Sequence, residues 1–363
     1  MRLFRFGFVS IDINQIMEVV KTMKYNLLGN TGVLVSEIGL GTMTFGGGEK
    51  WGVFGGLGEK ESAILVDQAM DAGVNFFDTA NVYSDGQSEE ILGKALKNKR
   101  HQALIATKVR GRTGSGPNEL GLSRLHIIGQ VEASLKRLGT DYIDLYQVHN
   151  PDQLTDWEET LRALDDLVRG GKVRYIGNSN MTGWNIMKTR GLSQLHGLHA
   201  FKSSQSYYSL AAREIEREII PMLKDQNMGL IVWSPLSGGF LSGKYTRDNP
   251  GNANDRHAKV PFPPVDKDKV FPIIDTLQDI AAARESTVAR IALAWVLNQK
   301  SVTSVVMGAK RPDQLQDNLA ASGIILTSDE LTRLDEVSRI PTEYPAWPFL
   351  EGDDSIVRKH LKY

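Results

Sequence analysis

The chain has 363 residues, of which 41% are hydrophobic and 23% charged, and its formal net charge at pH 7 is −1. This composition supports a sizeable core but gives no electrostatic footprint for nucleic acid. The sequence contains no cysteine, which excludes disulfides, thiolate nucleophiles, Fe–S clusters and Cys-bound zinc. No apolar run is long enough to span a bilayer, so we expect neither nucleic acid nor membrane as a partner, and the cytoplasm as the location.

The N-terminal segment, residues 1–23, differs in its residue pattern from the rest of the chain. Arg5, Asp12 and Asn14 interrupt its apolar stretch, which makes it a poor secretory signal. We therefore give this segment no role in the fold. The expected division is a leader of uncertain structure at residues 1–23, a barrel domain at 24–340 and a tail at 341–363.

Eight short runs rich in β-branched or aromatic residues recur along the chain, with helical patterns between them. This alternation is typical of a parallel sheet, and eight repeats predict an α/β fold of the (β/α)8 barrel type. The predicted strands are residues 37–42, 75–80, 103–108, 142–149, 173–179, 201–206, 229–235 and 302–308.

Capping signals mark several of the predicted helix ends. Thr155 with Glu158, and Thr327 with Glu330, fit the capping box that starts a helix. Glycines that follow the helical segments are expected to take the left-handed conformation that ends a helix. These glycines are Gly73, Gly139 and Gly170.

Three further segments complete the predicted barrel. The sequence NLLGNTGVLVSEI has two apolar stretches joined by a Gly-Asn-Thr-Gly turn, which predicts a β-hairpin that closes the bottom of the barrel. A Gly-rich segment at 41–59 and a Pro, Asn and Asp-rich segment at 246–268 predict long loops over the C-terminal face. Such loops are usually lids or binding loops, although plain insertions are nearly as common.

Polar or reactive residues close the predicted strands. In a barrel of this kind the active site lies at the C-terminal ends of the strands. Each residue alone has an ordinary structural explanation, such as a helix cap or a solvated turn, but only the closed barrel brings all of them to one rim. They are Thr42, Asp78 with Tyr83 just beyond it, Lys108, His149, Ser179 with Asn180, Gln205, Trp233 with Ser234, and Gly308.

These side chains favour some reaction classes over others. A glycosidase needs two opposed carboxylates, yet Asp78 alone closes a predicted strand, and metal-dependent hydrolysis needs clustered ligands that the strand ends lack, so we rank both lower. A tyrosine beside a lysine favours proton transfer, because the ammonium lowers the pKa of the phenol from about 10 towards neutrality. The sequence therefore predicts Tyr83 as an acid tuned by Lys108.

Several motifs resemble the aldo-keto reductase family. They are FFDTANVYSDGQSEEILGKAL, ATKVRG, LGTDYIDLYQVHNPD, VRYIGNSN and VWSPLSGGFLSGKY, in the family's order, and the resemblance runs from about Lys24 to about Asn318. It implies NADPH-dependent reduction of an aldehyde or ketone without a metal, with Tyr83 as general acid and His149 orienting the carbonyl. The implied catalytic residues are Asp78, Tyr83, Lys108 and His149.

The resemblance also implies a nicotinamide cofactor, NADPH/NADP+, held without the GxGxxG fingerprint that this chain lacks. Lys310 or Arg311 would pair with a 2′-phosphate, although both residues also fit as ordinary solvated charges. The carboxamide would lie at Ser179, Asn180 and Gln205, with Tyr207 or Tyr208 near the ring. The full set of expected cofactor-binding residues is Thr42, Met43, Asp78, Ser179, Asn180, Gln205, Tyr207, Trp233, Ser234, Pro235, Leu236, Ser237, Gly239, Lys244, Gly308, Lys310, Arg311, Gln314, Asp317 and Asn318, the last three facing adenine.

Phe45, Trp51, Phe54 and Asn150 are expected to select the small-molecule carbonyl substrate. Trp51 and Phe54 suggest an apolar wall of the pocket. Potassium-channel β-subunits resemble the same barrel. An NADPH-binding regulatory or redox-sensing subunit with slow turnover is therefore the alternative function, and a homo-oligomer stays open. Those subunits carry Asn at the position of His149, so the histidine favours the enzyme.

Overall fold

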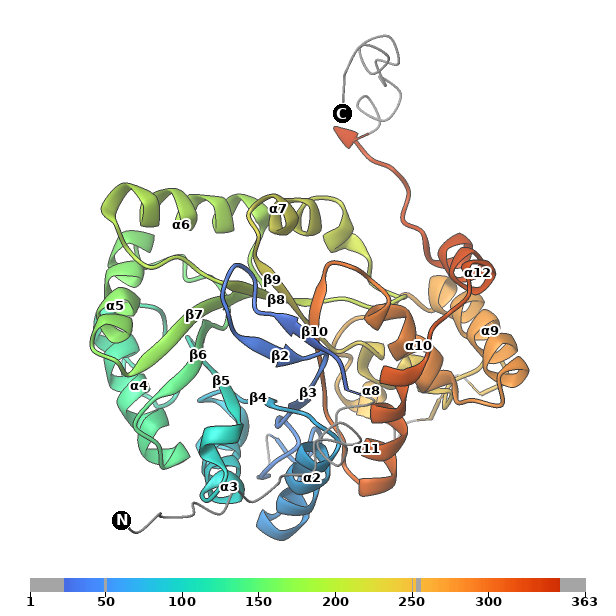
Figure 1. The fold of residues 1–363 in the computed structure, drawn as a ribbon, viewed down its shortest axis with the longest axis horizontal. Helices are drawn as coiled ribbons and strands as arrows, with labels where there is room; N and C mark the ends of the chain where they lie inside the picture. Colours follow the sequence, from blue (N-terminus) through green and yellow to red (C-terminus); the bar gives the residue numbers. More distant parts are fainter. Residues whose placement is uncertain (1–22, 49–50, 250, 253–255, 347–363) are drawn as a thin grey trace, which may run out of the picture.

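The computed structural model describes residues 23–48, 51–249, 251–252 and 256–346. Within them, eight parallel strands form a closed barrel in which the last strand pairs with the first, which confirms the predicted (β/α)8 fold (Figure 1). The predicted leader lies outside the described residues except for Met23, and so does the tail from residue 347 onward. The strands are β3 (Ile38–Gly41), β4 (Phe76–Asp78), β5 (Leu104–Val109), β6 (Ile143–Val148), β7 (Val173–Ser179), β8 (Ser203–Tyr207), β9 (Gly229–Trp233) and β10 (Val302–Met307).

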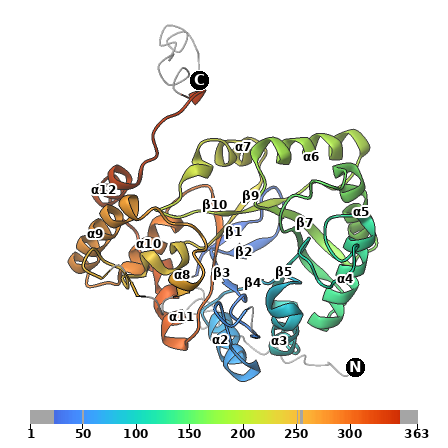
Figure 2. The ribbon, with the colours of Figure 1, turned by 180° about the vertical axis from the view of Figure 1, so that it is seen from behind.

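Helices surround the barrel on its outer side, as both ribbon views show (Figures 1 and 2). In the part of the chain that the structure describes, the segment between β9 and β10 carries three α-helices, whereas each of the other connections carries one. The helices are α2 (Glu59–Asp71), α3 (Gln87–Leu96), α4 (Arg124–Leu138), α5 (Trp157–Arg169), α6 (Gly183–His196), α7 (Ile219–Asp225), α8 (Arg256–Lys259), α9 (Lys267–Ala283), α10 (Val288–Leu297), α11 (Pro312–Leu319) and α12 (Ser328–Ser338).

The alternation of side chains along each strand divides the core in two. On β5, Ile105 and Val109 pack outward among the helices, whereas Ala106 packs inward against other strand residues such as Leu145 and Ile231. Because side chains alternate across a strand with a period of two, Lys108 falls on the inward side together with Ala106. The barrel interior therefore leads directly to the polar residues at its rim.

The predicted hairpin is present and closes the bottom of the barrel. Strands β1 (Tyr25–Leu27) and β2 (Leu34–Ser36) pair antiparallel, and the hairpin crosses the centre of the barrel in Figure 1. Leu28 and Val35 pack on the inner cluster at the amino-terminal ends of the strands. Gly29 has a φ of 57°, and a Cβ there would lie 2.4 Å from the Lys202 carbonyl oxygen, so no larger residue fits this turn.

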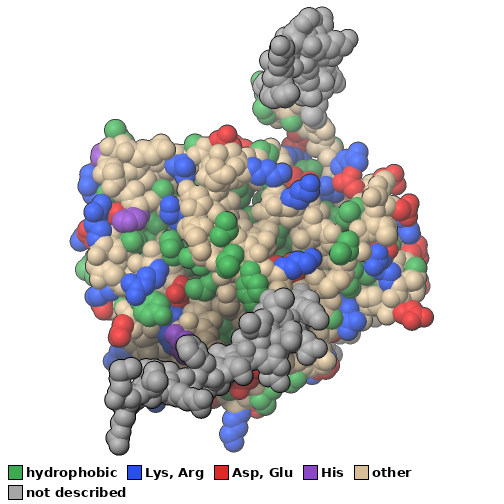
Figure 3. Space-filling view, in the orientation of Figure 1, with side chains coloured by type: hydrophobic (Ala, Val, Ile, Leu, Met, Phe, Trp, Pro, Cys, Tyr) green, Lys and Arg blue, Asp and Glu red, His purple; other side chains and the backbone are tan. Residues whose placement is uncertain are grey.

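The surface on the hairpin side carries acidic and basic side chains interspersed with one another, as Figure 3 shows. This pattern agrees with the formal net charge of −1. Among the described residues, no helix is long and apolar enough to cross a membrane.

The predicted helix starts are partly right. Thr327 and Glu330 form the expected capping box at the start of α12. The prediction at Thr155 is wrong, because Asp156 is the cap of α5 and its side chain accepts from the backbone of Glu158 at 2.9 Å. A carboxylate one residue later reaches the first free amides of the helix and adds a favourable charge to its dipole.

The predicted helix ends show one error of a single residue. Gly139 ends α4 with a φ of 63°, and Gly73 follows α2 with a φ of 89°, so both take the left-handed conformation as expected. The prediction at Gly170 is wrong, because its φ is −74° and the neighbouring Gly171 has the positive φ of 75°. Since both residues are glycine, composition does not distinguish which of them reverses the chain.

The two long predicted loops contact the residues at the carboxyl ends of the strands. In the first, Gly46 exchanges backbone hydrogen bonds with Leu57 and Gly56, so the described part of the loop folds back on itself. In the second, Phe262 stacks on the ring of Trp233, with ring centroids 5.6 Å apart. Both loops therefore lie beside the predicted site.

Candidate active site

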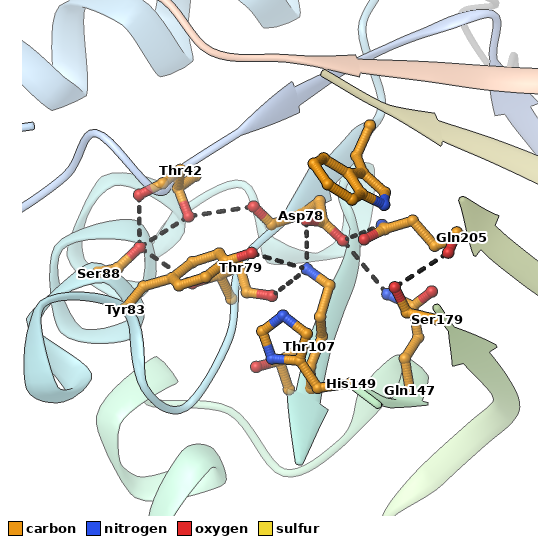
Figure 4. A network of polar contacts seen from close by, with 12 residues as sticks. Thr42, Asp78, Thr79, Tyr83, Ser88, Thr107, Gln147, His149, Ser179 and Gln205 are labelled. Atoms are coloured by element: carbon orange, nitrogen blue, oxygen red, sulfur yellow. Dashed lines mark hydrogen bonds and ion pairs between the residues drawn. The ribbon is translucent and has the colours of Figure 1, made fainter. Parts of the chain in front are cut away.

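The barrel brings all four predicted catalytic residues together, as Figure 4 shows for Asp78, Tyr83 and His149. Asp78 ends β4, Lys108 lies at the end of the neighbouring β5, and His149 directly follows β6. Tyr83 opens the short 3-10 helix η1 (Tyr83–Gly86) that follows β4. Their approach depends on the order and register of three adjacent parallel strands.

A buried ion pair forms the base of the site. The Nζ of Lys108 lies 2.5 Å from Oδ2 of Asp78, and their side chains are 0% and 5% exposed. The same ammonium donates to the Thr79 carbonyl oxygen at 2.9 Å. Burial of Lys108 opposes its charge, but Asp78 and Tyr83 together outweigh this effect and raise the pKa of Lys108. Lys108 therefore keeps its positive charge in the barrel.

Two amides hold the other oxygen of Asp78. Gln205 donates from Nε2 to Oδ1 at 2.7 Å, and Gln147 donates to the same oxygen at 3.2 Å. A buried carboxylate is tolerated only when its remaining lone pairs are satisfied in this way. The sequence analysis missed Gln147, although it stands two residues before His149 and therefore shares its face of the strand.

Tyr83 lies above the ion pair, with its Oη 3.5 Å from the Nζ of Lys108, the outer limit of a hydrogen bond. Burial raises the pKa of Tyr83, and this effect together with the charge of Asp78 outweighs the lowering effect of Lys108. The expected lowering of the Tyr83 pKa towards neutrality is therefore wrong, because burial of the phenol, assisted by the charge of Asp78, outweighs the lysine. The phenol keeps its proton at neutral pH.

The turn after Tyr83 fixes its position. Ser84, Asp85 and Gly86 have consecutive positive φ values of 48°, 53° and 96°. The Ser84 hydroxyl donates to the Phe45 carbonyl oxygen at 2.8 Å. Left-handed residues of this kind persist only where surrounding contacts hold them, so the first loop and the turn set the position of Tyr83 together.

His149 packs against Tyr83 with ring centroids 5.8 Å apart and an interplanar angle of 78°. Burial and the charges of Lys108 and Arg110 lower the pKa of His149 to about 3. The imidazole is therefore neutral over the physiological range, and it can both donate and accept one hydrogen bond.

Polar side chains beside His149 form a second, linked cluster. Asn180 donates to the His149 carbonyl oxygen at 3.0 Å and accepts from the Trp233 indole at 3.1 Å. The Ser179 hydroxyl donates to the Gln205 carbonyl oxygen at 3.0 Å. The residues expected to hold a carboxamide therefore lie next to the four predicted catalytic residues.

Of the two tyrosines expected near a nicotinamide ring, the structure turns only one towards the site. Tyr207 stacks on Trp233 with ring centroids 5.0 Å apart. Tyr208 is buried, and its hydroxyl donates to Glu216 at 2.6 Å on the opposite side. A flat aromatic surface, bordered by the amides of Asn180 and Gln205, fits a nicotinamide ring and its carboxamide.

The segment after β9 has a polar backbone turn. Ser234 and Ser237 both have a φ of 51°, and the Ser234 hydroxyl accepts from the backbone of Gly238 at 3.0 Å. Gly239, with a φ of 103°, continues the turn, and Lys244 lies exposed beyond it. Pro235 and Leu236 lie within the same turn.

The predicted adenosine-phosphate segment begins at Gly308, where an added Cβ would meet protein atoms only at ordinary distances of 3.5 Å or more. No protein contact therefore requires glycine at this exposed position. Arg311 pairs with Asp313 at 3.0 Å on the surface, and the backbone of Lys310 donates to Gln314 at 2.9 Å. These cations lie at the start of α11, as the sequence analysis expected.

The three residues expected to face adenine do not share one environment. Asp317 forms an ion pair with Arg290 of α10 at 2.8 Å and accepts from the Thr287 hydroxyl. Asn318 is 3% exposed, whereas Gln314 is only partly buried. Gln314 and Asp317 therefore both retain some exposed surface, whereas Asn318 has almost none.

The expected substrate-pocket residues also differ from one another. Trp51 contacts the Tyr83 ring edge-on at 5.8 Å and lies 5.9 Å from Phe54, which agrees with an aromatic wall beside the tyrosine. Asn150 is partly buried next to His149. Phe45 is 0% exposed and belongs to the core, so its expected place in the pocket is corrected: it anchors the loop instead.

Thr42 and Met43 follow the end of β3, whose last residue, Gly41, pairs with Asp78. Thr42 is fully buried, and its hydroxyl bonds Ser88 and the Asp78 carbonyl oxygen at 2.8 and 3.2 Å. Met43 is partly exposed on the same segment. Among the described residues, no group of three or more His, Cys, Asp or Glu side chains has an arrangement that could hold a metal ion.

The fold and site define the class of protein: a (β/α)8 barrel with a tyrosine, a neutral histidine and a buried lysine–aspartate pair at the carboxyl ends of its strands. The chain belongs to the aldo/keto reductase family, whose sequence model matches residues 37–339.

Curated relatives agree with this family over nearly their whole length. The versiconal hemiacetal acetate reductase of Aspergillus parasiticus is 37% identical over 335 residues, covering 86% of this chain and 96% of the relative. An uncharacterized oxidoreductase of Bacillus subtilis, YrpG, is 36% identical over 326 residues, covering 87% and 96%. A probable voltage-gated potassium channel subunit beta of Arabidopsis thaliana is 35% identical over 341 residues, covering 89% and 99%. The family and the reductase names of its members support an oxidoreductase.

Proposed function

We propose that the protein uses NADPH to reduce an aldehyde or ketone to an alcohol, with Tyr83 as the general acid. The observation that carries this proposal is the position of a protonated phenol beside a buried, charged Lys108 and a neutral His149. This combination suits proton donation to a carbonyl oxygen.

The residues present fit a bound dinucleotide. The aromatic face of Tyr207 and Trp233, the amides of Asn180 and Gln205, and the open backbone at Gly308 suit the ring, the carboxamide and a phosphate in turn. When bound, NADPH supplies the hydride that adds to the carbonyl carbon.

Tyr83 gives its phenolic proton to the carbonyl oxygen, and a negative charge develops on its own oxygen. The ammonium of Lys108 stabilises this developing charge, since both groups lie in a water-poor site where such interactions are strong. Asp78 fixes the ammonium in position, and Gln147 and Gln205 fix Asp78. Asp78, Gln147 and Gln205 therefore act as positioning residues that hold the Lys108 ammonium in a fixed orientation.

His149 orients the carbonyl. A neutral imidazole donates one N–H hydrogen bond without adding a second full positive charge beside Lys108. Trp51 closes the side of the site next to Tyr83, and it keeps water from the phenol.

A preference for NADPH over NADH is part of the proposal. Lys310 and Arg311 lie exposed at the N-terminus of α11, where the helix dipole also favours an anion. A 2′-phosphate would compete with Asp313 for the Arg311 guanidinium.

A regulatory subunit is the second candidate function, because a relative of similar identity is named a probable potassium channel subunit beta. Such a subunit would bind NADPH and turn it over slowly. The neutral histidine placed against Tyr83 favours the enzyme.

A substrate screen tests the proposal. Purified protein is mixed with NADPH or NADH and a panel of aromatic and aliphatic aldehydes and ketones, and NADPH oxidation and alcohol formation are both measured. Multiple-turnover alcohol formation, faster with NADPH, is the expected result. Tight NADPH binding with no more than slow turnover across the panel would favour the regulatory subunit, and absence of NADPH binding would exclude both functions.

A further inference from the structure

Arg110 stands at the rim of the site, where its charge helps to keep His149 neutral, but the proposed reaction gives its guanidinium no partner. It follows Val109, the last residue of β5, and His149 follows Val148 on β6. Val109 and Val148 are paired, and the His149 amide donates to the Val109 carbonyl oxygen at 2.9 Å. The arginine and the histidine therefore leave the barrel side by side.

The backbone of Arg110 is held in a rare conformation. Its φ is 139°, a region that side chains other than glycine seldom enter. A hydrogen bond holds it there, because its carbonyl oxygen accepts from the Gly121 amide at 2.9 Å. The next residue, Gly111, lies so close to Val82 that an added Cβ would be 2.4 Å from that side chain. Strained residues of this kind concentrate at functional sites, and Val82 precedes Tyr83.

Arg110 is partly buried, and no ion pair to its guanidinium is found among the described residues. Its Nε is enclosed and makes no hydrogen bond with the described residues. By contrast, the partly buried Arg100 and Arg137 pair with Asp144 and Glu89, each at 2.7 Å. A guanidinium nitrogen that is enclosed without a partner is costly, so the site favours an anion supplied from outside.

Asp152 is the acidic neighbour of Arg110, but its oxygens are already engaged. They accept from the Leu122 amide at 2.8 Å, the Thr155 hydroxyl at 2.7 Å and the Leu154 amide at 3.0 Å. Asp152 forms no ion pair with Arg110 among the described contacts. Its charge moderates that of Arg110 without occupying the guanidinium.

We infer that Arg110 determines specificity by binding an anionic oxygen group of the substrate, so that the preferred substrate is an aldehyde or ketone that carries a carboxylate. The planar guanidinium matches a carboxylate, and its place beside His149 puts that group next to the carbonyl to be reduced. This inference rests on the proposed carbonyl reduction and adds a substrate class to it.

The test uses matched neutral and anionic substrates. The ortho, meta and para isomers of carboxybenzaldehyde and their methyl esters are reduced with NADPH by the wild type and by the Arg110→Gln, Arg110→Lys and Arg124→Gln variants. Arg124 is the matched control because it is an exposed arginine that already pairs with Asp166 at 2.6 Å. Its substitution changes the net charge by the same amount as Arg110→Gln.

The wild type is expected to prefer at least one acid over its ester in kcat/KM. Arg110→Gln should reduce that preference by roughly 10- to 100-fold, mainly through KM, as expected for a lost charge-assisted hydrogen bond. Arg110→Lys should retain part of the preference for the acid, and this partial loss tests the inference if the Gln variant does not fold. Arg124→Gln should retain all of the preference.

Three results overturn the inference: a wild type without preference for any acid, a preference that is undiminished in Arg110→Gln or, if that variant does not fold, in Arg110→Lys, or equal losses for acids and esters. In each of them the wild type still reduces the esters with NADPH, so the proposed function stands. If no substrate is reduced by the wild type, the proposed function fails and this inference fails with it.

Discussion

Replacing Lys108 with Met separates the catalytic charge from the stability of the barrel. The Lys108 ammonium and the Asp78 carboxylate lie 2.5 Å apart with side chains 0% and 5% exposed, so the substitution leaves a buried carboxylate without its cation. Removing one partner of such a pair costs about 3–5 kcal/mol. Gln147 and Gln205 continue to donate to Asp78, so we expect a loss of about 3 kcal/mol, near the lower end.

The assay is urea unfolding together with NADPH-dependent turnover. The double variant Lys108→Met, Asp78→Asn removes the stranded charge and is expected to regain most of the lost unfolding free energy, because replacing both partners of a buried pair is nearly neutral. Both variants lack the Lys108 ammonium, so kcat should fall by roughly 100- to 1,000-fold in each of them. A single variant as stable as the wild type, or a double variant with restored turnover, would refute the reasoning.

Two other predictions concern the cofactor and the histidine. The variant Lys310→Ala, Arg311→Ala is expected to raise KM for NADPH roughly 10- to 100-fold and KM for NADH far less, and an equal effect on both would remove the 2′-phosphate from the proposal. The pKa of His149 is lowered to about 3 in the native protein, so the unfolded chain takes up a proton near its ordinary pKa of about 6.5 while the native one does not. The wild type should therefore lose about 2 kcal/mol of stability relative to His149→Asn between about pH 8 and pH 5, and parallel urea-unfolding profiles would contradict the buried neutral imidazole.

The barrel was predictable because its signals are local and repeated. Each strand is a short β-branched or aromatic run, and the residue types that close the runs, such as Asp78 and Lys108, follow from the rule that strand ends converge. The errors at Thr155 and Gly170 are shifts of one residue. Where two neighbouring residues have nearly equal capping or turning ability, tertiary contacts select one of them.

Features that depend on burial were not predictable from sequence. Phe45 has the residue type of a pocket wall, but the folding of the first loop places it in the core. The sign of the Tyr83 pKa shift follows from desolvation, which a list of neighbouring charges does not contain.

The hydrogen-bond partners of individual side chains also could not be predicted from the sequence. Gln147 and Gln205 meet at Asp78 only after β6 and β8 are placed in the barrel. The ATKVRG motif likewise does not reveal that Arg110 adopts a positive φ and has no partner for its Nε among the described residues. Features of this kind can be recognised only once the strands are assembled and their carboxyl ends form the rim of the barrel.

The most direct test of the central claim is the single-turnover rate of hydride transfer in Tyr83→Phe. Protein saturated with NADPH is mixed rapidly with an aldehyde that the wild type reduces, and NADPH oxidation is followed alongside the Kd for NADPH. We expect the rate to fall by roughly 100- to 10,000-fold, the usual contribution of a general acid, with the Kd nearly unchanged. A Phe variant that oxidises NADPH at the wild-type rate would contradict the assignment of Tyr83 as the proton donor.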